Sequence, residues 1–276
     1  MARQSNGLSN KLSRLRPALL LRTPATHGFS IQSQYSGGKM STRMDEFEAK
    51  LKDILNTPWD AQDARVVPRT QDVKQKDGAK RVEATYLYAD LADSTLLAKK
   101  FKVEFAARVV RSYLRIAVDC MRAKGGHIRS FDGDRVMGIF IGDRRRNDAV
   151  EAALNIQWVV DKSLNPLIKA RLDKQSLSWH VSQRCGIDDG NTFIVRGGAR
   201  DNSDLVSIGS APNIAARLSS VRGESGHVTI TSRVYNFLLD RNKTAKNGES
   251  MWKKRDESAV GPHIVTTYSS GWRRTP

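Results

Sequence analysis

Two acidic segments lie where strand-forming sequence gives way to a turn. Asp90 ends an apolar run, and the small and hydroxyl residues 91–95 follow it just before a predicted helix. Asp134 belongs to the hairpin pattern Asp132-Gly133-Asp134. Carboxylate oxygens are suitable ligands for divalent cations, and free N–H groups at a helix start bind phosphate. Together the segments predict a metal-assisted phosphate site, whereas each taken alone also fits a helix cap or a solvated turn.

A third segment, 209–218, combines an amide with a guanidinium. Asn213 and Arg217 are four residues apart in a predicted helix, so both side chains project from one face. Ile214, Leu218 and Val221 lie on another face and would anchor the helix. An amide beside a guanidinium suits a ribose hydroxyl or a phosphate oxyanion. The pattern fits an ordinary exposed polar stripe equally well.

The elements that must position these side chains follow a regular order. Hydrophobic periodicity, glycine and proline predict strands at 82–90, 127–132, 135–141, 177–187, 191–196, 227–231 and 263–269, and helices at 94–124, 148–171, 211–221 and 232–240. Pro166 is expected to break or kink its helix, and Ser210 to cap the helix that follows it. The order β-α-β-β-α-β predicts an α+β fold with a ferredoxin-like core and C-terminal additions. In that fold we expect the first hairpin strand beside the opening strand, so that the turn approaches Asp90.

The first 81 residues carry little of this pattern. Residues 1–40 contain six basic residues and no acid, which predicts a disordered tail, although an organellar transit peptide or a start at Met40 or Met44 also fits. Residues 42–56 have apolar side chains at helical spacing and predict a short amphipathic helix, with a polar linker from 57 to 81. The folded domain is therefore expected at 82–276.

Composition narrows the class of protein. The chain has 276 residues and a formal net charge of +17, which favours an anionic partner such as nucleic acid, lipid or a nucleoside triphosphate. No apolar run approaches the roughly 20 residues of a membrane span. The two cysteines, Cys120 and Cys185, exclude a disulfide scaffold and favour a reducing, cytoplasmic compartment.

Taken together, the segments resemble the catalytic domain of the class III nucleotidyl cyclases. The resemblance runs from about Val82 to Leu239. Tyr88–Thr95 looks like the family's first metal-aspartate motif, Gly133–Met137 like its Gly-Asp hairpin, Arg184–Gly190 like the strand and turn in between, and Asn213–Arg217 like its Asn-x-Ala-Ala-Arg helix. All four are in the family's order and spacing, so the joint match is far more specific than any one motif.

The resemblance implies a head-to-tail homodimer with active sites at the interface between subunits. Asp90, Leu91 and Asp134 of one subunit would hold two Mn²⁺ or Mg²⁺ ions. Asn213 and Arg217 of the partner subunit would orient the ribose and stabilise charge on the α-phosphorus.

The resemblance also implies the reaction. The backbone from Leu91 through Ser94 and Thr95 would cradle the phosphates of a nucleoside triphosphate. The enzyme would be a phosphorus–oxygen lyase that releases pyrophosphate and forms a 3′,5′-cyclic nucleotide.

The positions that select the base depart from the purine cyclases. Adenylate cyclases carry Lys four residues before the second metal aspartate and Asp or Thr seven before the asparagine, where this chain has Ser130 and Val206. Val206 cannot form a hydrogen bond through its side chain. The sequence around both metal aspartates resembles the pyrimidine cyclases of bacterial Pycsar antiphage systems. Those enzymes make cyclic UMP or cyclic CMP, which activates a separate effector.

Two further residues bear on the base under this resemblance. Tyr88 would narrow the base pocket, and Arg129 would contact a uracil carbonyl. A core tyrosine and a surface arginine are the plain alternatives. We therefore expect UTP, ahead of CTP, as the substrate.

Three other functions stay open on the sequence. They are an adenylate cyclase with non-standard base-selecting residues, a pseudo-cyclase that binds nucleotide and regulates a partner, and a nucleic-acid-binding module. The basic charge motivates the last of these, but the chain carries no recognisable nucleic-acid-binding motif. Lys253 and Lys254 fit either a clamp on the triphosphate or a solvated basic pair.

Overall fold

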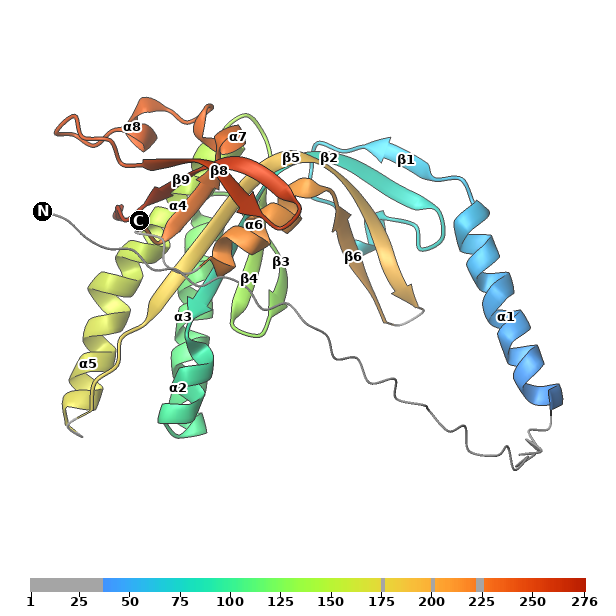
Figure 1. Ribbon diagram of the computed structural model, residues 1–276, viewed down its shortest axis with the longest axis horizontal. Helices are drawn as coiled ribbons and strands as arrows, with labels where there is room; N and C mark the ends of the chain where they lie inside the picture. The colour runs from blue at the N-terminus through green and yellow to red at the C-terminus, as the bar shows by residue number, and fades with distance from the viewer. Residues whose placement is uncertain (1–36, 175–176, 200–201, 222–225) are drawn as a thin grey trace, which may run out of the picture. The chain divides into compact units, whose positions relative to one another are not determined.

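The computed structural model describes residues 37–174, 177–199, 202–221 and 226–276 (Figure 1). It divides into two compact units, Met1–Lys52 and Asp53–Pro276. Helix α1 (Gly37–Asn56) begins in the first unit and contains the predicted amphipathic helix. Every other described element belongs to the second unit. The tail expected at 1–40 lies mostly outside the described residues.

The nine strands of the described chain form one sheet. Its main order is β3-β4-β2-β5-β7-β9-β8, with β1 paired to β2 and β6 paired to β5. The strands are β1 (Asp60–Asp63), β2 (Gly78–Ala92), β3 (His127–Asp132), β4 (Arg135–Phe140), β5 (Ser182–Ala199), β6 (Asn202–Ile208), β7 (Val228–Thr231), β8 (Lys253–Val260) and β9 (His263–Ser270). The order β3-β4-β2-β5 is that of a ferredoxin-like core, as predicted, and the strands after β5 are C-terminal additions.

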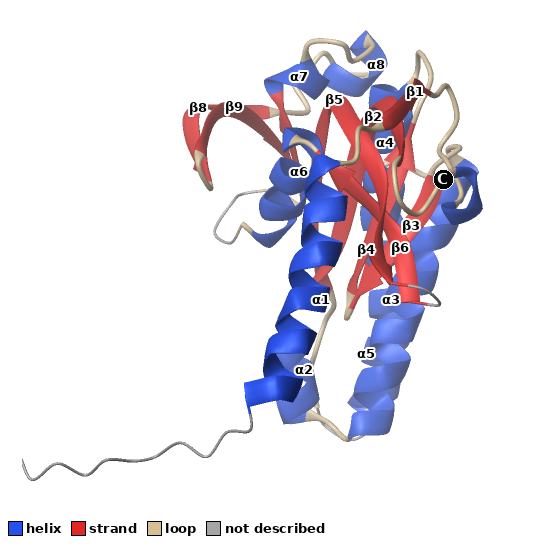
Figure 2. Cartoon of the chain, turned by 90° about the vertical axis from the view of Figure 1, so that its right-hand side faces the viewer, coloured by secondary structure: helices blue, strands red, loops and turns tan. Residues whose placement is uncertain are grey.

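Helices pack on both faces of this sheet (Figure 2). They are α2 (Ser94–Lys100), α3 (Val103–Ala123), α4 (Arg145–Val159), α5 (Asn165–Asp173), α6 (Ser210–Ser220), α7 (Ser232–Tyr235) and α8 (Asp240–Lys243). None of the helices in the described ranges has both the length and the apolar character that a membrane span requires.

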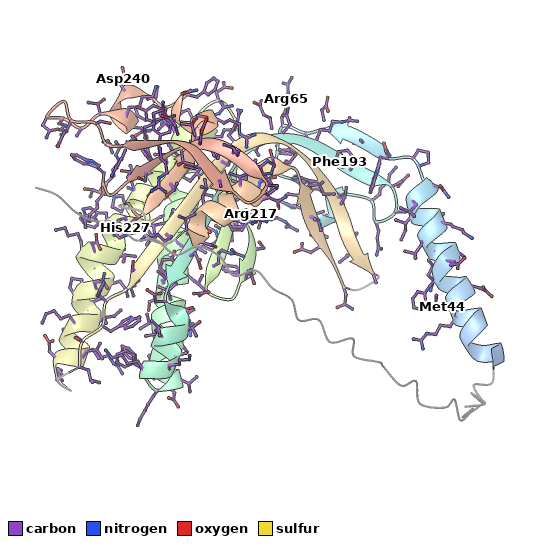
Figure 3. All side chains as sticks on the ribbon, in the orientation of Figure 1. Met44, Arg65, Phe193, Arg217, His227 and Asp240 are labelled. Carbon is purple, nitrogen blue, oxygen red and sulfur yellow. The ribbon has the colours of Figure 1, made fainter. Side chains whose placement is uncertain are left out.

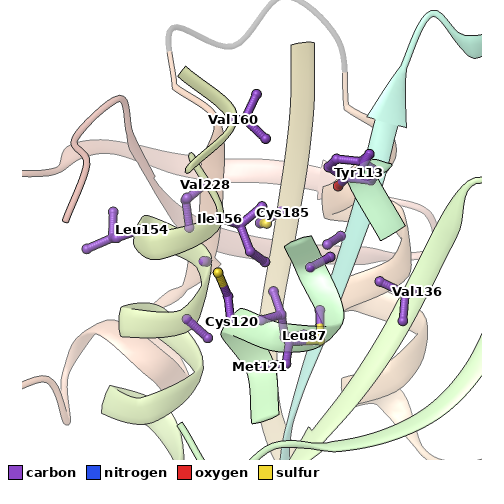
Figure 4. Packing of buried hydrophobic residues seen from close by; sticks show 14 of the residues in the cluster. Leu87, Tyr113, Cys120, Met121, Val136, Leu154, Ile156, Val160, Cys185 and Val228 are labelled. Atoms are coloured by element: carbon purple, nitrogen blue, oxygen red, sulfur yellow. The ribbon is translucent and has the colours of Figure 1, made fainter. Parts of the chain in front are cut away.

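Alternation along β2 creates two cores. Leu87 and Ala89 point into the larger core, which they share with α3 and α4 (Figure 4). Ala84 and Tyr86 point to the opposite face, where they pack with Ala211 and other residues of α6. Successive strand residues face opposite sides of a sheet, so β2 is buried on both faces.

The strand pairing corrects one prediction. The second hairpin strand, β4, pairs with β2, and β3 lies at the edge of the sheet. The prediction that the first hairpin strand lies beside β2 is therefore wrong. Asp134 still approaches Asp90 because it immediately precedes β4.

Two predicted helices are interrupted. The helix expected at 94–124 is divided at Phe101, whose extended backbone turns the ring toward Phe105 and Trp179, with ring centroids 5.0 and 6.0 Å away. The helix expected at 148–171 contains a π-helical turn at Val160–Leu164. Pro166 follows in the first turn of α5, and the backbone stays helical from Arg145 to Asp173, so the predicted break does not occur and the irregularity is the π-helical turn before the proline.

The polar segment Asp188-Asp189-Gly190 does not form the predicted turn. It continues through β5 because both carboxylates are buried and each has a hydroxyl and an arginine partner, on opposite faces of the sheet. Asp188 accepts a hydrogen bond from Thr231 at 2.5 Å and pairs with Arg233. Asp189 accepts one from Thr85 at 2.6 Å and pairs with Arg145 at 2.8 Å. A charge pattern typical of a loop is thus part of the core.

The structure differs from the sequence predictions in three further places: the expected linker, an additional strand and the start of α6. The expected linker 57–81 carries β1 and a 3₁₀ turn at Thr70–Asp72. Strand β6 was not predicted. Gly209, rather than Ser210, is the N-cap of α6, and no side chain caps that helix.

His227 gives the fold a pH dependence. Burial lowers the pKa of His227 below its ordinary value, and Arg184 and Arg273 act in the same direction. The folded chain therefore favours the neutral ring, and stability is lost as the pH falls through the ordinary imidazole range near ~6.5.

We expect His227→Gln to narrow the difference in urea midpoint between pH 8 and pH 5.5. Carboxylates titrate below this pH range and do not obscure the effect. In Asp161, for example, burial raises the pKa, but hydrogen bonds from Gln157 and Arg273 outweigh burial and lower it. If the urea midpoints of His227→Gln at pH 8 and pH 5.5 differ as much as those of the wild type, His227 does not cause the pH dependence of stability.

Candidate active site

Strand register brings the two predicted metal aspartates together. Asp90 lies opposite Arg135 of β4 and opposite Arg184 of β5. Asp134, the residue before Arg135, therefore lies beside the end of β2. By alternation, the Asp90 side chain projects to the same face of the sheet as Tyr88, the face on which α6 packs.

A buried phenol reports the proximity of both carboxylates. The Tyr113 ring of α3 is fully buried, and its hydroxyl has no hydrogen-bond partner among the described residues. Burial raises the pKa of Tyr113 well above its ordinary value, and the carboxylates of Asp90 and Asp134 act in the same direction. This direction agrees with the strand register, which places both carboxylates near the end of β2.

The donor set at this end of β2 fits divalent cations held by oxygen. Within the described ranges, no group of three or more His, Cys, Asp or Glu side chains could hold a metal. Two carboxylates with main-chain oxygens and a triphosphate would supply hard oxygen ligands. Leu91 is buried against the larger core, so only its main-chain oxygen could bind an ion.

The predicted phosphate loop is a sharp turn between β2 and α2. Asp93 adopts the left-handed conformation with φ of 60°, and its carbonyl accepts hydrogen bonds from the N–H groups of Leu96 and Leu97. Ser94 and Thr95 begin α2 directly behind the strand that carries Asp90. The loop therefore follows Asp90 directly in the chain, and its binding of phosphate stays a prediction.

Asn213 and Arg217 line one cleft of about 670 Å³. Arg217 is labelled in Figure 3. Both come from α6, which lies so close to β5 that a Cβ on Gly186 would meet the Ala215 carbonyl oxygen at 2.1 Å. Arg135 also lines this cleft, which brings the hairpin that carries Asp134 to the helix that carries Arg217.

The turn between β8 and β9 forms another wall of the cleft. Gly261 has φ of +62°, and a Cβ there would lie 2.6 Å from Nε of Arg217. The backbone of the turn therefore packs against the guanidinium, and His263 lines the same cleft. Sequence analysis missed both residues, although Gly261-Pro262 between two strands is a turn signal.

Lys253 and Lys254 do not line this cleft. Both are exposed on β8, and Lys254 forms an ion pair with Asp256 at 2.8 Å. Of the two roles considered for these lysines, a clamp on the triphosphate and a solvated basic pair, their exposed position in a single chain matches the second.

Tyr88 lies beneath a cation that sequence analysis did not single out. Cζ of Arg135 lies 5.4 Å from the centroid of the Tyr88 ring, and Arg135 also forms an ion pair with Asp132 at 2.5 Å. Burial raises the pKa of Tyr88, and Arg135 partly opposes that rise. The signal available in the sequence was the position of Arg135 directly after Asp134.

The other residues expected to face the base lie elsewhere in the single chain. Arg129 pairs with Asp204 of β6, and its side chain is only 16% exposed. Ser130 lies opposite Met137 on the edge strand β3. Val206 lies on β6 opposite Val195 and is half exposed. None of the three lines the cleft of Arg217.

Comparison with curated proteins finds uridylate cyclases across most of the chain. The chain is 34% identical over 232 residues to one from Rhodovulum sp. (strain MB263), covering 83% of this chain and 97% of that protein. It is 37% identical over 231 residues to one from Xanthomonas perforans, covering 83% and 96%. No family model matches the chain.

Solved structures agree with the fold. The adenylyl cyclase CyaB from P. aeruginosa superposes with a TM-score of 0.58 at 22% identity, covering 71% of this chain and 97% of that one. The guanylyl cyclase Cya2 superposes with a TM-score of 0.57 at 20% identity, covering 71% and 95%. The α+β fold is thus that of class III cyclase domains. With its uridylate cyclase relatives, this identifies the chain as a nucleotidyl cyclase that belongs to the uridylate cyclase family.

Proposed function

We propose that the chain converts UTP into 3′,5′-cyclic UMP and pyrophosphate. The observation that carries the proposal is the register of β2 and β4, which sets Asp90 beside Asp134 in a chain whose curated relatives are uridylate cyclases. In the reaction the ribose 3′-oxygen attacks the α-phosphorus and loses its proton. The bond from the α-phosphorus to the oxygen bridging to the β-phosphate breaks, and pyrophosphate leaves.

Asp90 and Asp134, with the main-chain oxygen of Leu91, would hold two divalent cations, Mn²⁺ or Mg²⁺. Such ions lower the pKa of the 3′-hydroxyl and neutralise charge on the triphosphate. The N–H groups of the loop through Ser94 and Thr95 would contact phosphate oxygens, because a helix start presents unpaired donors.

Asn213 and Arg217 would act on the nucleotide bound by the partner subunit. Two residues of one helix face can orient the ribose and stabilise the charge that develops around the α-phosphorus, and a fixed donor needs little reorganisation during the reaction. Packing of Arg217 against the β8–β9 turn restrains the guanidinium and supports this role. The arrangement needs a head-to-tail homodimer with two equivalent sites.

The base would be selected at Tyr88. The ring, covered by Arg135, narrows the space at the end of β2, and a purine is excluded there by size. Arg129 and Val206 keep their proposed places in the base pocket only if the second subunit brings β3 and β6 to the nucleotide.

Tyr88→Ala should shift selectivity toward purine triphosphates. We expect the ratio of ATP to UTP turnover to rise about tenfold or more, because the smaller side chain removes the steric exclusion. Phe131→Ala is the matched control, since Phe131 is an exposed aromatic residue on the β3–β4 hairpin, next to the strand that carries Tyr88. Equal ratios in Tyr88→Ala and the wild type would refute the pocket assignment.

Incubating the purified chain with each of the four triphosphates and Mn²⁺ tests the substrate directly. Cyclic UMP as the main product is the expected result, cyclic CMP would transfer the proposal to CTP, and a product from ATP alone would overturn the pyrimidine assignment. Tight binding of a triphosphate without turnover would favour a pseudo-cyclase.

The biological role that we propose is that of the Pycsar antiphage systems. The cyclic nucleotide would act in the cytoplasm as a second messenger that activates a separate effector during infection. The resemblance of the sequence around Asp90 and Asp134 to the cyclases of those systems supports this role. Loss of phage protection in cells that express an Asp90→Asn chain together with the effector would be the expected result.

A further inference from the structure

Helix α1 presents an apolar stripe to solvent. Met44, Phe47, Leu51 and Ile54 are 55%, 49%, 55% and 61% exposed, respectively. The side chain of Met44 is labelled on this helix in Figure 3. Exposed apolar side chains are common singly, but a contiguous row of large ones marks an interaction surface.

The spacing of the stripe specifies the kind of partner. The intervals from Met44 to Phe47, Leu51 and Ile54 are three, four and three residues, which place the four side chains at positions a, d, a and d of a heptad. A strict seven-residue repeat keeps its seam facing a partner helix that supercoils around it. We propose that α1 pairs with α1 of a second copy of this chain as a parallel, in-register coiled coil.

Charge determines the orientation. In this heptad frame Arg43 occupies position g and Glu48 the following e position. A parallel pair sets Arg43 of each helix against the partner's Glu48, so two opposite-charge contacts flank the seam. An antiparallel pair would set g positions against each other, and those positions are Arg43 and Lys50. Among the described residues of one chain, Glu48 contacts Lys52 at 3.4 Å, and both side chains are exposed.

The length of the seam determines when it forms. From Met44 to Ile54 the seam spans 11 residues, fewer than the roughly 12–15 that an isolated helix needs for marginal stability. The seam therefore needs tethering, and this part of the proposal rests on the two-copy arrangement proposed above. Tethering two weak contacts raises their effective concentration to roughly the millimolar range. A twofold axis relates parallel, in-register helices, which is the symmetry of a head-to-tail dimer.

Disulfide cross-linking tests the register. The native thiols, Cys120 and Cys185, are both buried, so a thiol introduced on α1 is the accessible one. Leu51→Cys places a thiol at an a position, where the two copies face each other. Ala49→Cys, two residues away on the exposed f position, is the matched control. After mild oxidation of the full chain without nucleotide, we expect a covalent dimer from Leu51→Cys and at least fivefold less from Ala49→Cys.

A charge exchange tests the orientation in the same background. Glu48→Arg should reduce the cross-linking of Leu51→Cys severalfold because Arg43 of the partner subunit then meets a like charge. Adding Arg43→Glu should restore cross-linking. An antiparallel or nonspecific contact predicts no restoration, and that result would overturn the proposal.

The remaining outcomes are also decisive. Equal cross-linking at positions 51 and 49, or none at 51, refutes the seam. Leu51→Cys could also cross-link only after residues 1–36 are removed. That result would show that the chain's own N-terminal segment covers the stripe, and it would refute the pairing of α1 with a second copy. Asp90→Asn in the Leu51→Cys chain should abolish cyclic nucleotide formation and leave the cross-link unchanged. Failure of the proposed function is thereby distinguished from failure of the seam.

Discussion

Two inactive variants of this chain should restore cyclase activity when they are mixed. Asp90→Asn alone should lower kcat by at least ~10³-fold, because an amide is a poor metal ligand, and Arg217→Ala by about 10²–10³-fold. A heterodimer of the two holds one site in which Asp90, Asp134, Asn213 and Arg217 are all intact. With random exchange of subunits, half of the dimers are heterodimers, so the mixture should recover roughly a quarter of the wild-type activity.

The control for this experiment is a mixture of Asp90→Asn and Asp134→Asn. Both changes affect the same half of the site, so every site in every dimer keeps one defect and no activity returns. Recovery in this control, or none in the mixture of Asp90→Asn with Arg217→Ala after subunit exchange, would contradict a site shared between subunits. The measurement is cyclic UMP formed per total chain.

Gly186→Ala should damage both the fold and the activity. A Cβ at this position would lie 2.1 Å from the carbonyl oxygen of Ala215 and 2.4 Å from the amide nitrogen of Ser219, both in the backbone of α6. Since a backbone cannot turn aside as a side chain can, α6 must move away from the sheet. We expect a loss of about 1–3 kcal/mol in the free energy of unfolding.

The same shift carries Asn213 and Arg217 with the helix. A displacement of about 1 Å at a positioning element can cost on the order of 10²-fold in rate, so kcat should fall well beyond what the loss of stability explains. Urea unfolding and turnover, measured on the same preparation below the unfolding midpoint, separate the two effects.

Gly190→Ala is the matched control on the same strand and under the same helix. A Cβ there would meet only the Cβ of Ala211 at 3.5 Å, an ordinary contact. This variant should keep its stability and activity, because alanine also restricts the unfolded chain. If Gly186→Ala behaves like Gly190→Ala, the close packing of α6 on β5 does not hold the helix in place.

The local pattern of the sequence predicted most of the core elements and the neighbourhood of the two aspartates. Asp90 lies near the end of one strand and Asp134 immediately precedes another, and the order of the elements alone implies that they lie close together at one end of these strands. The identity of the hairpin strand beside β2 was predicted wrongly. Composition did carry a signal, because β3 (HIRSFD) is mostly polar, as an exposed edge strand can be, whereas β4 (RVMGIF) is mostly apolar and buried.

Long-range partners account for the other errors. Asp188 and Asp189 have the composition of a turn, and only Arg233, Thr231, Arg145 and Thr85, which are distant in the sequence, make a buried strand possible there. The same holds for Arg135 and Gly261. Their roles depend on the ring of Tyr88 and the guanidinium of Arg217, and no local pattern encodes those contacts.

The central position of β2 has a consequence for synthesis of the chain on the ribosome. One edge of β2 is completed by β5, and the hydrogen bond between Thr85 and Asp189 spans 104 residues. Until residues 182–199 emerge, the nascent chain presents an open edge of apolar, β-forming residues, the kind of edge that pairs with other chains. Products truncated before β5 should therefore aggregate through the open edge of the strand that bears Asp90.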